Sequence, residues 1–183
     1  MITLGKRQDN TLLTADLERI HNLLICGGNE GMRNNLLDII RRQIKADECI
    51  EMDTNDAVAN MKEKIEDGTL PAGCTFIIND YANYALAEGR ENRMAASEYK
   101  KDIDYIASHS KAAGIRLILV CSRPCTDLLT IRLKHLFPLR VALKTISRVD
   151  SIVILDCPMA AGISDNEIVY RDEISCEVVR IDT

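Results

Sequence analysis

The chain has 183 residues, of which 46% are hydrophobic and 28% charged, and a formal net charge of −5. These values are typical of one soluble globular domain spanning residues 1–183. The acidic balance argues against nucleic-acid binding through overall charge, so a DNA contact would need a local basic patch. Two basic groups are candidates, although each is more simply a solvated helix face. They are Arg41, Arg42 and Lys45, and Arg132, Lys134 and His135.

The chain has seven cysteines, and most of them lie within apolar runs. We therefore expect the buried, reduced thiols of a cytoplasmic protein. With three histidines and no CxxC spacing, we expect no metal site. The first ten residues lack the apolar segment of a signal peptide. No apolar run approaches the ~18 residues of a membrane span, so direct membrane insertion is not expected.

The first part of the chain predicts three strands and a helix. Apolar residues at 2–4 and 11–17 indicate two strands joined by a polar turn. Residues 22–26, NLLIC, form a continuous apolar run, which is typical of a strand covered on both faces. From Met32 to Ile44 apolar residues recur at helical spacing, which predicts an amphipathic helix.

The next part predicts two strands on either side of a second helix. Residues 48–52, ECIEM, indicate a short strand. Asp53 or Thr54 can cap a helix that ends at Gly68. Residues 74–80, CTFIIND, then indicate a buried strand that ends in polar residues.

The third part contains the strongest helical pattern. Residues 81–93 are polar and fit neither pattern clearly, whereas residues 94–113 predict a helix with Gly114 as its stop. Residues 115–121 indicate a buried strand, and residues 126–135 indicate a helix. The inner face of the helix over 94–113 is expected to hold Ala95, Tyr99, Ile103, Ile106, Ser110 and Ala113.

The last part predicts a strand, a capped helix and a hairpin. Residues 139–144 indicate the strand, and Ser147 can cap a helix through Leu155. Residues 166–170 and 175–181 indicate a closing hairpin. Apolar strands that alternate with amphipathic helices predict a three-layer α/β domain with a mostly parallel sheet. Its antiparallel edge strands are expected at the termini.

The apolar run at 22–26 leads into GGNEGMRN, which has the placing of a phosphate-binding loop. A working loop reads GxxxxGK[ST]: its backbone N–H groups wrap the phosphates, its Lys reaches the outer phosphates and its hydroxyl holds Mg²⁺. If Gly27 is the first glycine, Met32 replaces the last glycine. Arg33 then replaces the Lys, and Asn34 replaces the Ser or Thr. The candidate loop residues are Gly27, Gly28, Asn29, Glu30, Gly31, Met32, Arg33 and Asn34.

These replacements weaken the case for tight ATP binding. Met32 brings a side chain to a point where backbone must pass close to phosphate. Arg33 keeps a positive charge that could still meet a phosphate, whereas Glu30 adds a carboxylate of like charge to the ligand. Two interpretations stay open: a helix-entry turn without a ligand, or weak and altered nucleotide binding.

Residues 110–156 resemble the second half of the FtsK/SpoIIIE motor domain. In that family a helix ends in R-A-A-G-I, a strand reads L-I-L-A, T-Q-R-P follows, and I-P-x-R-I-A and S-x-x-D-S-x-x-I-L-D come later. Residues 4–27 are also similar to the family's lead-in to its phosphate loop, whereas the resemblance is weak over residues 45–73. It implies a three-layer P-loop NTPase fold of the RecA/FtsK type. The matching residues are Ala112, Ala113, Gly114, Ile115, Leu117, Ile118, Leu119, Arg123, Pro124, Asp127, Pro138, Arg140, Ala142, Ser147, Asp150, Ser151, Ile154, Leu155 and Asp156.

The functional positions of that family differ here. Its second-strand motif ends in Asp-Glu, where the Asp orients Mg²⁺ and the Glu polarises the attacking water; this chain has Asn79 and Asp80. Ser122 stands for the Gln that can sense the outer phosphate, and Lys111 stands for the Arg before A-A-G-I. Taking Asp80 as the metal acid instead would leave Tyr81 as the base, which is no better.

The short interval between the loop and the acidic strand resembles the last ATPase-like module of the type VII secretion ATPases EssC and EccC. The resemblance leaves three functions open. The preferred one is a pseudo-ATPase without cofactor or metal, whose partners are copies of itself, an active motor module, or secreted or transferred cargo. The second is a weak ATPase that uses ATP and Mg²⁺ to drive DNA or protein translocation, and the third is a DNA-binding module without hydrolysis. In each case the chain could be one module of a longer, membrane-linked protein.

Overall fold

The continuous apolar runs of the sequence form the centre of a nine-stranded sheet. The computed structural model describes residues 1–86 and 90–181. The parallel strands β4, β5, β6, β3 and β7 are adjacent in that order, and nearly all residues of β3, β5, β6 and β7 are buried, as the sequence predicts for strands covered on both faces. Their bounds are β3 (Asn22–Cys26), β4 (Cys49–Met52), β5 (Thr75–Ile78), β6 (Arg116–Cys121) and β7 (Leu139–Leu143).

The remaining strands extend the sheet on one side only, in the order β2-β1-β9-β8-β7. Each of these strands pairs antiparallel with its neighbour, so the predicted antiparallel edge is confirmed and contains segments from both ends of the chain. Their bounds are β1 (Ile2–Lys6), β2 (Leu12–Ala15), β8 (Glu167–Arg171) and β9 (Cys176–Arg180).

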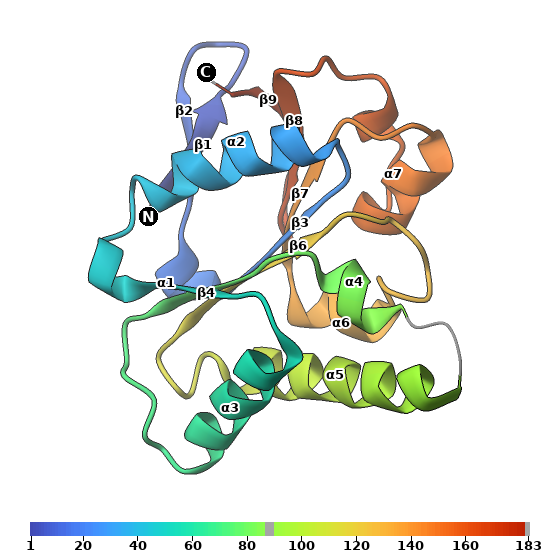
Figure 1. The fold of residues 1–183 in the computed structure, drawn as a ribbon. Coiled ribbons are helices and arrows are strands. Elements are labelled where there is room, and N and C mark those ends of the chain that lie inside the picture. The colour runs from blue at the N-terminus through green and yellow to red at the C-terminus, as the bar shows by residue number, and fades with distance from the viewer. Residues whose placement is uncertain (87–89, 182–183) are drawn as a thin grey trace.

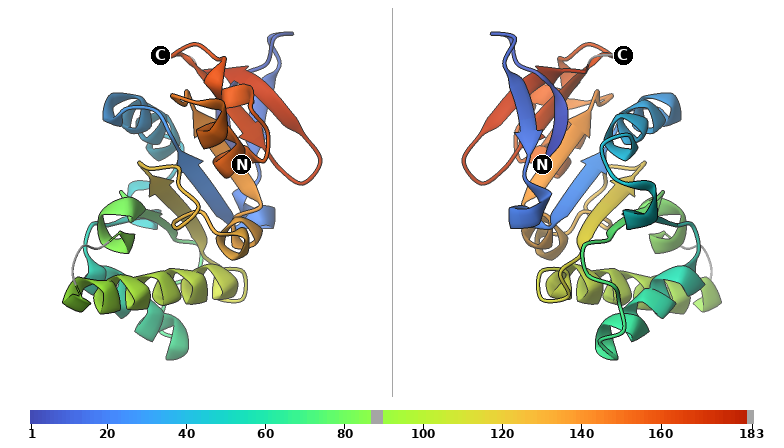
Figure 2. Two further views of the ribbon diagram at one scale, coloured as in Figure 1. Left: turned by 90° about the vertical axis from the view of Figure 1, so that its right-hand side faces the viewer. Right: turned by 90° about the vertical axis from the view of Figure 1, so that its left-hand side faces the viewer.

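Helices cover both faces of the sheet and complete the predicted three layers (Figures 1 and 2). Helix α2 packs on one face, and α3 to α7 pack on the other. Successive residues of β3 point to opposite faces. Leu23 and Ile25 therefore join the core between the sheet and α2, whereas Leu24 and Cys26 join the core between the sheet and α3 to α7. The helices are α1 (Leu17–Ile20), α2 (Glu30–Arg41), α3 (Asn55–Glu66), α4 (Tyr81–Ala85), α5 (Arg90–His109), α6 (Ile131–Leu136) and α7 (Arg148–Leu155), with short 3₁₀ turns η1 (Ala46–Glu48) and η2 (Met159–Ala161).

Local capping explains which helix boundaries were predicted correctly. Thr54 and Ser147 accept hydrogen bonds from backbone N–H groups of the first turns of α3 and α7, as expected. The strand predicted over 11–17 stops at Ala15 because Asp16 caps α1. The helix predicted from residue 126 begins only at Ile131, where Thr130 is the N-cap.

The helix predicted over 94–113 ends at His109, so Ser110 and Ala113 of its expected inner face lie beyond α5, and Ala113 is only half-buried. Tyr99, Ile103, Ile106 and Ser110 are buried, but Ala95 is exposed and Ala96 takes its place in the core. Part of the ambiguous segment 81–93 forms α4 and the start of α5, whereas its residues 87–89 lie outside the described residues. Within the described ranges, no helix combines the length and the hydrophobicity that a membrane span requires.

A buried arginine joins β7 to the end of α7. Arg140 is 8% exposed, and its Nη1 donates to the carbonyl of Ile154 and to the Asp156 carboxylate at 2.8 Å. Asp156 ends α7 with a left-handed backbone (φ 57°) and also forms an ion pair with Lys134 of α6. Burial raises the pKa of Asp156, but the hydrogen bonds from Lys134 and Arg140 outweigh it, so the pKa lies below the ordinary 3.8.

The Asp156 carboxylate should therefore stabilise the fold at neutral pH. Asp156→Asn keeps a residue that tolerates the left-handed backbone and should lower the free energy of unfolding by about 1 kcal/mol, since the pair is partly exposed. Asp156→Ala should cost about 1 kcal/mol more because alanine disfavours that backbone. Urea unfolding measures both variants.

The same pair predicts a pH dependence. A lowered pKa means that the stabilisation is present above pH 3.8 and is lost as the pH falls through the lower folded value. The difference between wild type and Asp156→Asn should be constant from pH 7 to 5 and shrink below pH 3.8. A difference that does not change with pH would contradict this role.

Candidate nucleotide-binding site

The turn between β3 and α2 contains three residues, Gly27, Gly28 and Asn29. Both glycines have a left-handed backbone, with φ of 86° and 62°. A Cβ atom on Gly28 would lie 2.8 Å from the Cβ of Leu143, and one on Gly27 would lie 3.0 Å from the Leu143 carbonyl oxygen. The two glycines are therefore required by the backbone and by the close approach of the turn to β7.

Several backbone N–H groups of this segment already have protein acceptors. The N–H of Gly28 donates to the carbonyl of Lys144 at 3.0 Å. The N–H of Met32 donates to the side-chain oxygen of Asn29 at 2.9 Å, and that of Arg33 donates to the Asn29 carbonyl at 3.1 Å. In a working loop such N–H groups point at the phosphates instead.

The Arg33 side chain is turned back onto the turn. Its Nη1 donates to the carbonyl oxygens of Gly28 at 2.8 Å and Gly27 at 3.2 Å. To reach a phosphate, the guanidinium would have to give up these two hydrogen bonds. Arg33, which was expected to take the place of the loop Lys, therefore stabilises the present conformation of the turn.

The structure corrects the expected start of the helix and places the Glu30 carboxylate outside the pocket. The helix begins at Glu30 and not at Met32, because Asn29 caps it two residues earlier. The positions aligned with the last glycine, the Lys and the Ser or Thr therefore lie inside the first turns of α2. Glu30 is exposed on this helix and does not line the pocket, so its carboxylate does not fill the mouth of the loop.

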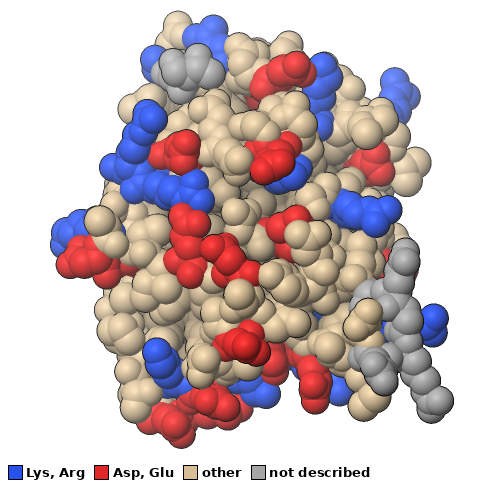
Figure 3. All heavy atoms as spheres, in the orientation of Figure 1, with Lys and Arg blue, Asp and Glu red and all other residues tan. Residues whose placement is uncertain are grey.

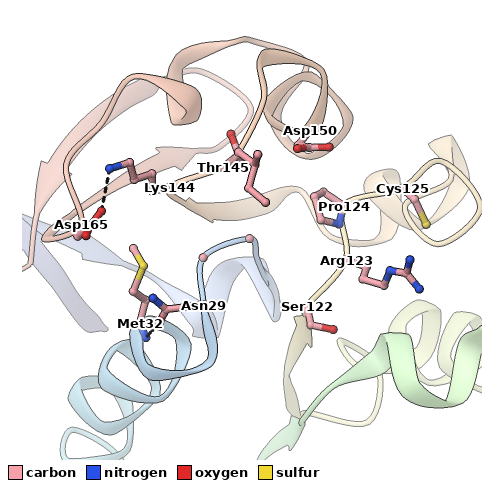
Figure 4. A pocket seen from close by; sticks show the side chains of 13 residues that line it. Asn29, Met32, Ser122, Arg123, Pro124, Cys125, Lys144, Thr145, Asp150 and Asp165 are labelled. Atoms are coloured by element: carbon pink, nitrogen blue, oxygen red, sulfur yellow. Dashed lines mark hydrogen bonds and ion pairs between the residues drawn. The ribbon is translucent and has the colours of Figure 1, made fainter.

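A pocket of about 650 Å³ lies beside the glycine turn, at the carboxyl ends of β3, β6 and β7 (Figure 4). Thr145 faces the glycine turn, whereas Arg123 extends away from it (Figure 4). Met32, Ser122, Pro124 and Ile146 are among the other lining residues. The full set is Gly27, Gly28, Asn29, Met32, Ser122, Arg123, Pro124, Cys125, Lys144, Thr145, Ile146, Asp150 and Asp165.

The charges that line this pocket cancel. The cations Arg123 and Lys144 are matched by the carboxylates Asp150 and Asp165. Lys144 forms an ion pair with Asp165 at 2.9 Å, and Asp150 accepts the backbone N–H of Ser147 in a capping box. A strongly anionic triphosphate would therefore meet no excess of positive charge in this pocket.

The structure brings together two of the residues predicted at the acidic strand. Asp80 follows β5 and Ser122 follows β6, and the Ser122 hydroxyl donates to the Asp80 carboxylate at 2.7 Å. Asn79 precedes Asp80 at the same edge of the sheet, where the carboxyl ends of parallel strands meet. Lys111 does not join them, because it lies before β6 and lines a different pocket at the opposite edge.

The alternative register, with Tyr81 as the base, is not supported. Tyr81 is 2% exposed, and its ring stacks on Tyr99 with 5.9 Å between centroids. Burial raises the pKa of the Tyr81 hydroxyl, so it stays protonated at neutral pH. Tyr81 is therefore a core residue.

The residues present fit a bound Mg²⁺ poorly. Mg²⁺ prefers carboxylate and hydroxyl oxygens in octahedral geometry, and here one oxygen of Asp80 already accepts the Ser122 hydroxyl. Asn34 is exposed on α2. Among the described residues, no group of three or more His, Cys, Asp or Glu side chains could hold a metal ion.

Ion pairs neutralise most of the two basic groups considered for DNA. Arg41 pairs with Asp38 and Glu51, and Lys45 pairs with Glu48. Arg132 and Lys134 pair with Asp104 and Asp156. Figure 3 shows acidic and basic side chains interspersed over one face of the molecule. Lys45 and Arg132 are well exposed, as expected for solvated faces, whereas the side chain of Lys134 is only 15% exposed.

Sequence reasoning missed one wall of the pocket, which comes from the segment after β7. Lys144, Thr145, Ile146 and Asp150 belong to it. A parallel strand that pairs with β3 must end beside the glycine turn, so the residues after β7 were candidates for this wall. The sequence did not show that β7 is the strand next to β3, and this neighbour is needed for the prediction.

The two glycine roles can be separated by matched variants. Gly28→Ala should strain the backbone and also press on Leu143, and we expect a loss of at least about 3 kcal/mol in the free energy of unfolding. Gly68→Ala has the same left-handed backbone (φ 66°) but nothing within 4 Å, so it should cost about 1–2 kcal/mol. Chemical unfolding measures both variants. Equal losses of unfolding free energy would show that the close contact of Gly28 with Leu143 does not add to the cost of the substitution.

Sequence comparison identifies relatives for part of the chain, although no family model matches it. The DNA translocase FtsK of Haemophilus ducreyi is 35% identical over 106 residues, which are 57% of this chain and 10% of the relative. That of Chlorobaculum tepidum is 34% identical over 80 residues, which are 44% of this chain and 9% of the relative. The chain therefore spans about a tenth of the length of these translocases.

Solved structures share the fold over nearly the whole chain. The pCW3 conjugation coupling protein TcpA, with ATPγS, has a TM-score of 0.83 at 14% identity, covering 98% of this chain and 64% of that one. The cytoplasmic domain of the Thermomonospora curvata type VII secretion ATPase EccC has a TM-score of 0.73 at 12% identity, covering 98% and 28%. EssC (ATPases 2 and 3) of Geobacillus thermodenitrificans has a TM-score of 0.68 at 10% identity, covering 100% and 41%.

At these identities the structural likeness shows the fold alone, and it agrees with the fold that the sequence resemblance implied. The sequence likeness adds a relationship over about half of the chain. The chain thus has the fold of the P-loop ATPases, and about half of its sequence is related to the FtsK DNA translocases.

Proposed function

We propose that this chain is an FtsK/SpoIIIE-type ATPase-like module that does not hydrolyse ATP and that acts as an interaction or regulatory module of a translocation machine. One observation carries the proposal: the segment expected to bind phosphate uses its own donors internally. The N–H of Gly28 is bonded to Lys144, and the guanidinium of Arg33 is bonded to the carbonyls of Gly27 and Gly28.

The chemistry of the acidic strand supports the same proposal. Hydrolysis in this fold needs a carboxylate for Mg²⁺ and a second one for water. Here the first position is the neutral Asn79, and the carboxylate of Asp80 is hydrogen-bonded to Ser122. The two charges of each sign that line the pocket leave no net attraction for a triphosphate.

An exposed apolar surface supports a role in protein contacts. Ile131 on α6 and Val149 and Ile152 on α7 are 73%, 68% and 47% exposed, and Ile146 just before α7 is fully exposed. Val149 and Ile152 are about one turn apart on α7, and exposed apolar side chains that lie together are typical of a protein–protein interface. The named relatives act in DNA translocation, conjugation and type VII secretion, and one EccC structure contains a signal sequence peptide. We therefore propose a copy of this chain, an active motor module or cargo as the partner.

One observation favours a second candidate, a weak but active motor. The pocket beside the glycine turn is open, and Asp80 and Ser122 lie together at the expected edge of the sheet. In this version Arg33 would release the turn and bind phosphate, and Asp80 would act on the metal or the water. DNA as the partner has less support, because most residues of the basic groups are in ion pairs.

Thermal unfolding with ATP and Mg²⁺ distinguishes the two candidates. A ligand at 100 times its dissociation constant adds about 2.7 kcal/mol, which raises the melting temperature of a domain this size by roughly 5–10 °C. We expect a shift below about 1 °C at millimolar ATP and Mg²⁺, because binding requires broken hydrogen bonds at Gly28 and Arg33. An active FtsK-type motor measured in parallel serves as the positive control.

Phosphate release provides the second arm of this test. We expect no turnover above the buffer rate, and no difference between wild type and Asp80→Asn. A saturable melting shift together with turnover that disappears in Asp80→Asn would establish the weak motor and reject the proposal.

A further inference from the structure

Two cysteines that are distant from the glycine turn in sequence lie in contact in the fold. Cys157 follows the end of α7, and Cys176 begins β9. Their Sγ atoms are 3.3 Å apart, and both side chains are half-buried and free. Neither thiol lines the pocket, and the function proposed above does not use them.

The surroundings of Cys176 keep its thiol mostly protonated at neutral pH. The sulfur of Met159 lies 3.7 Å from the Sγ of Cys176, and Arg171 is opposite Cys176 in the β8–β9 pairing. Burial and the neighbouring Cys157 raise the pKa of the Cys176 thiol to about 11, while Arg171 acts in the opposite direction. Exchange should therefore accelerate with rising pH, because the thiolate is the nucleophile.

We propose that Cys157 and Cys176 form a thiol–disulfide exchange site whose substrate is a low-molecular-weight disulfide. One thiolate attacks the disulfide R–S–S–R, forms a mixed disulfide with the protein and releases R–S⁻, which takes up a proton. The second thiolate attacks the protein sulfur of that mixed disulfide and releases the second R–S⁻. The protein loses two thiol protons and gains one S–S bond, and the oxidant becomes two R–SH molecules.

Because the two sulfur atoms are in contact, attack by the second cysteine should be faster than reaction with another oxidant molecule. The two sulfurs are already side by side, so the mixed disulfide has its resolving thiol within reach. Cys157 lies in the short segment between α7 and η2, and Cys176 is the first residue of β9. The structure thus assigns an intramolecular disulfide as the product.

The crosslink would act on the wall of the pocket. The Ser151 hydroxyl donates to the Cys157 carbonyl at 2.7 Å and accepts the N–H of Ala160 at 3.0 Å. The Ala160 carbonyl accepts the N–H of Thr145, which faces the glycine turn. A disulfide would therefore fasten the segment that holds Thr145 to β9.

The chain contains its own matched control pair. Cys26 and Cys121 are register partners on the neighbouring strands β3 and β6, but both are fully buried. A dissolved disulfide cannot reach them without unfolding. Both pairs are close in space, but only the pair at Cys157 is accessible, so only that pair should be oxidised in the folded chain.

The test uses the folded wild-type chain and glutathione disulfide at pH 8. After blocking free thiols, proteolysis and mass spectrometry should find Cys157 linked to Cys176, with Cys26 and Cys121 blocked only after unfolding. The closed loop of about 20 residues should raise the melting temperature by roughly 5–10 °C, and a reductant should reverse the rise. Cys157→Ser and Cys176→Ser should each keep a glutathione on the remaining cysteine of the pair, without that rise.

Three results would overturn the proposal. The first is that Cys157 and Cys176 stay unlinked in a large excess of glutathione disulfide. The second is that Cys26 and Cys121 become linked at the same rate as Cys157 and Cys176. The third is that a mixed disulfide with glutathione persists in the wild type. Peptide mapping of the wild type does not depend on whether the serine variants fold. None of these readouts involves nucleotide, so the result is independent of the function proposed above.

Discussion

The hydrogen bond from the Gly28 N–H to the Lys144 carbonyl is the interaction on which the character of the site depends. It attaches the turn after β3 to the end of β7, and it can form only because glycine permits the left-handed backbone and the contact with Leu143. With the turn attached there, α2 starts after three residues, and Arg33 hydrogen-bonds to the turn itself. In a working loop such a backbone N–H points at a phosphate oxygen instead, and the proposed function depends on this difference.

The hydrophobic packing of the fold lies on both faces of the sheet. The two apolar cores on either face of the sheet are complete, and the parallel strands β3, β6 and β7 still end at one edge. This edge is where an open α/β sheet forms its binding crevice, and a pocket remains there. The fold alone therefore does not determine the chemistry of the site, and the proposal of a non-hydrolysing module depends on the residues at this edge.

The sequence predicted those features that local chemistry determines. Continuous apolar runs identified the buried strands, and Thr54 and Ser147 identified two helix starts. It did not predict that α2 begins at Glu30, because Asn29 was read as a loop residue and not as an N-cap. The sequence aligned Asp80 and Ser122 with family positions but did not predict their hydrogen bond. That bond, the pocket wall after β7 and the Cys157–Cys176 contact depend on strand order and packing, which no local pattern contains.

The backbone amide of Gly28 reports most directly on the central claim. Titration of the ¹⁵N-labelled chain with ATP and Mg²⁺, followed by NMR, should leave the Gly28 amide resonance unmoved and its hydrogen exchange slow, since its proton stays bonded to Lys144. Saturable movement of the Gly28 and Arg33 amide resonances at micromolar nucleotide would show that the turn opens to receive phosphate, and it would contradict the account.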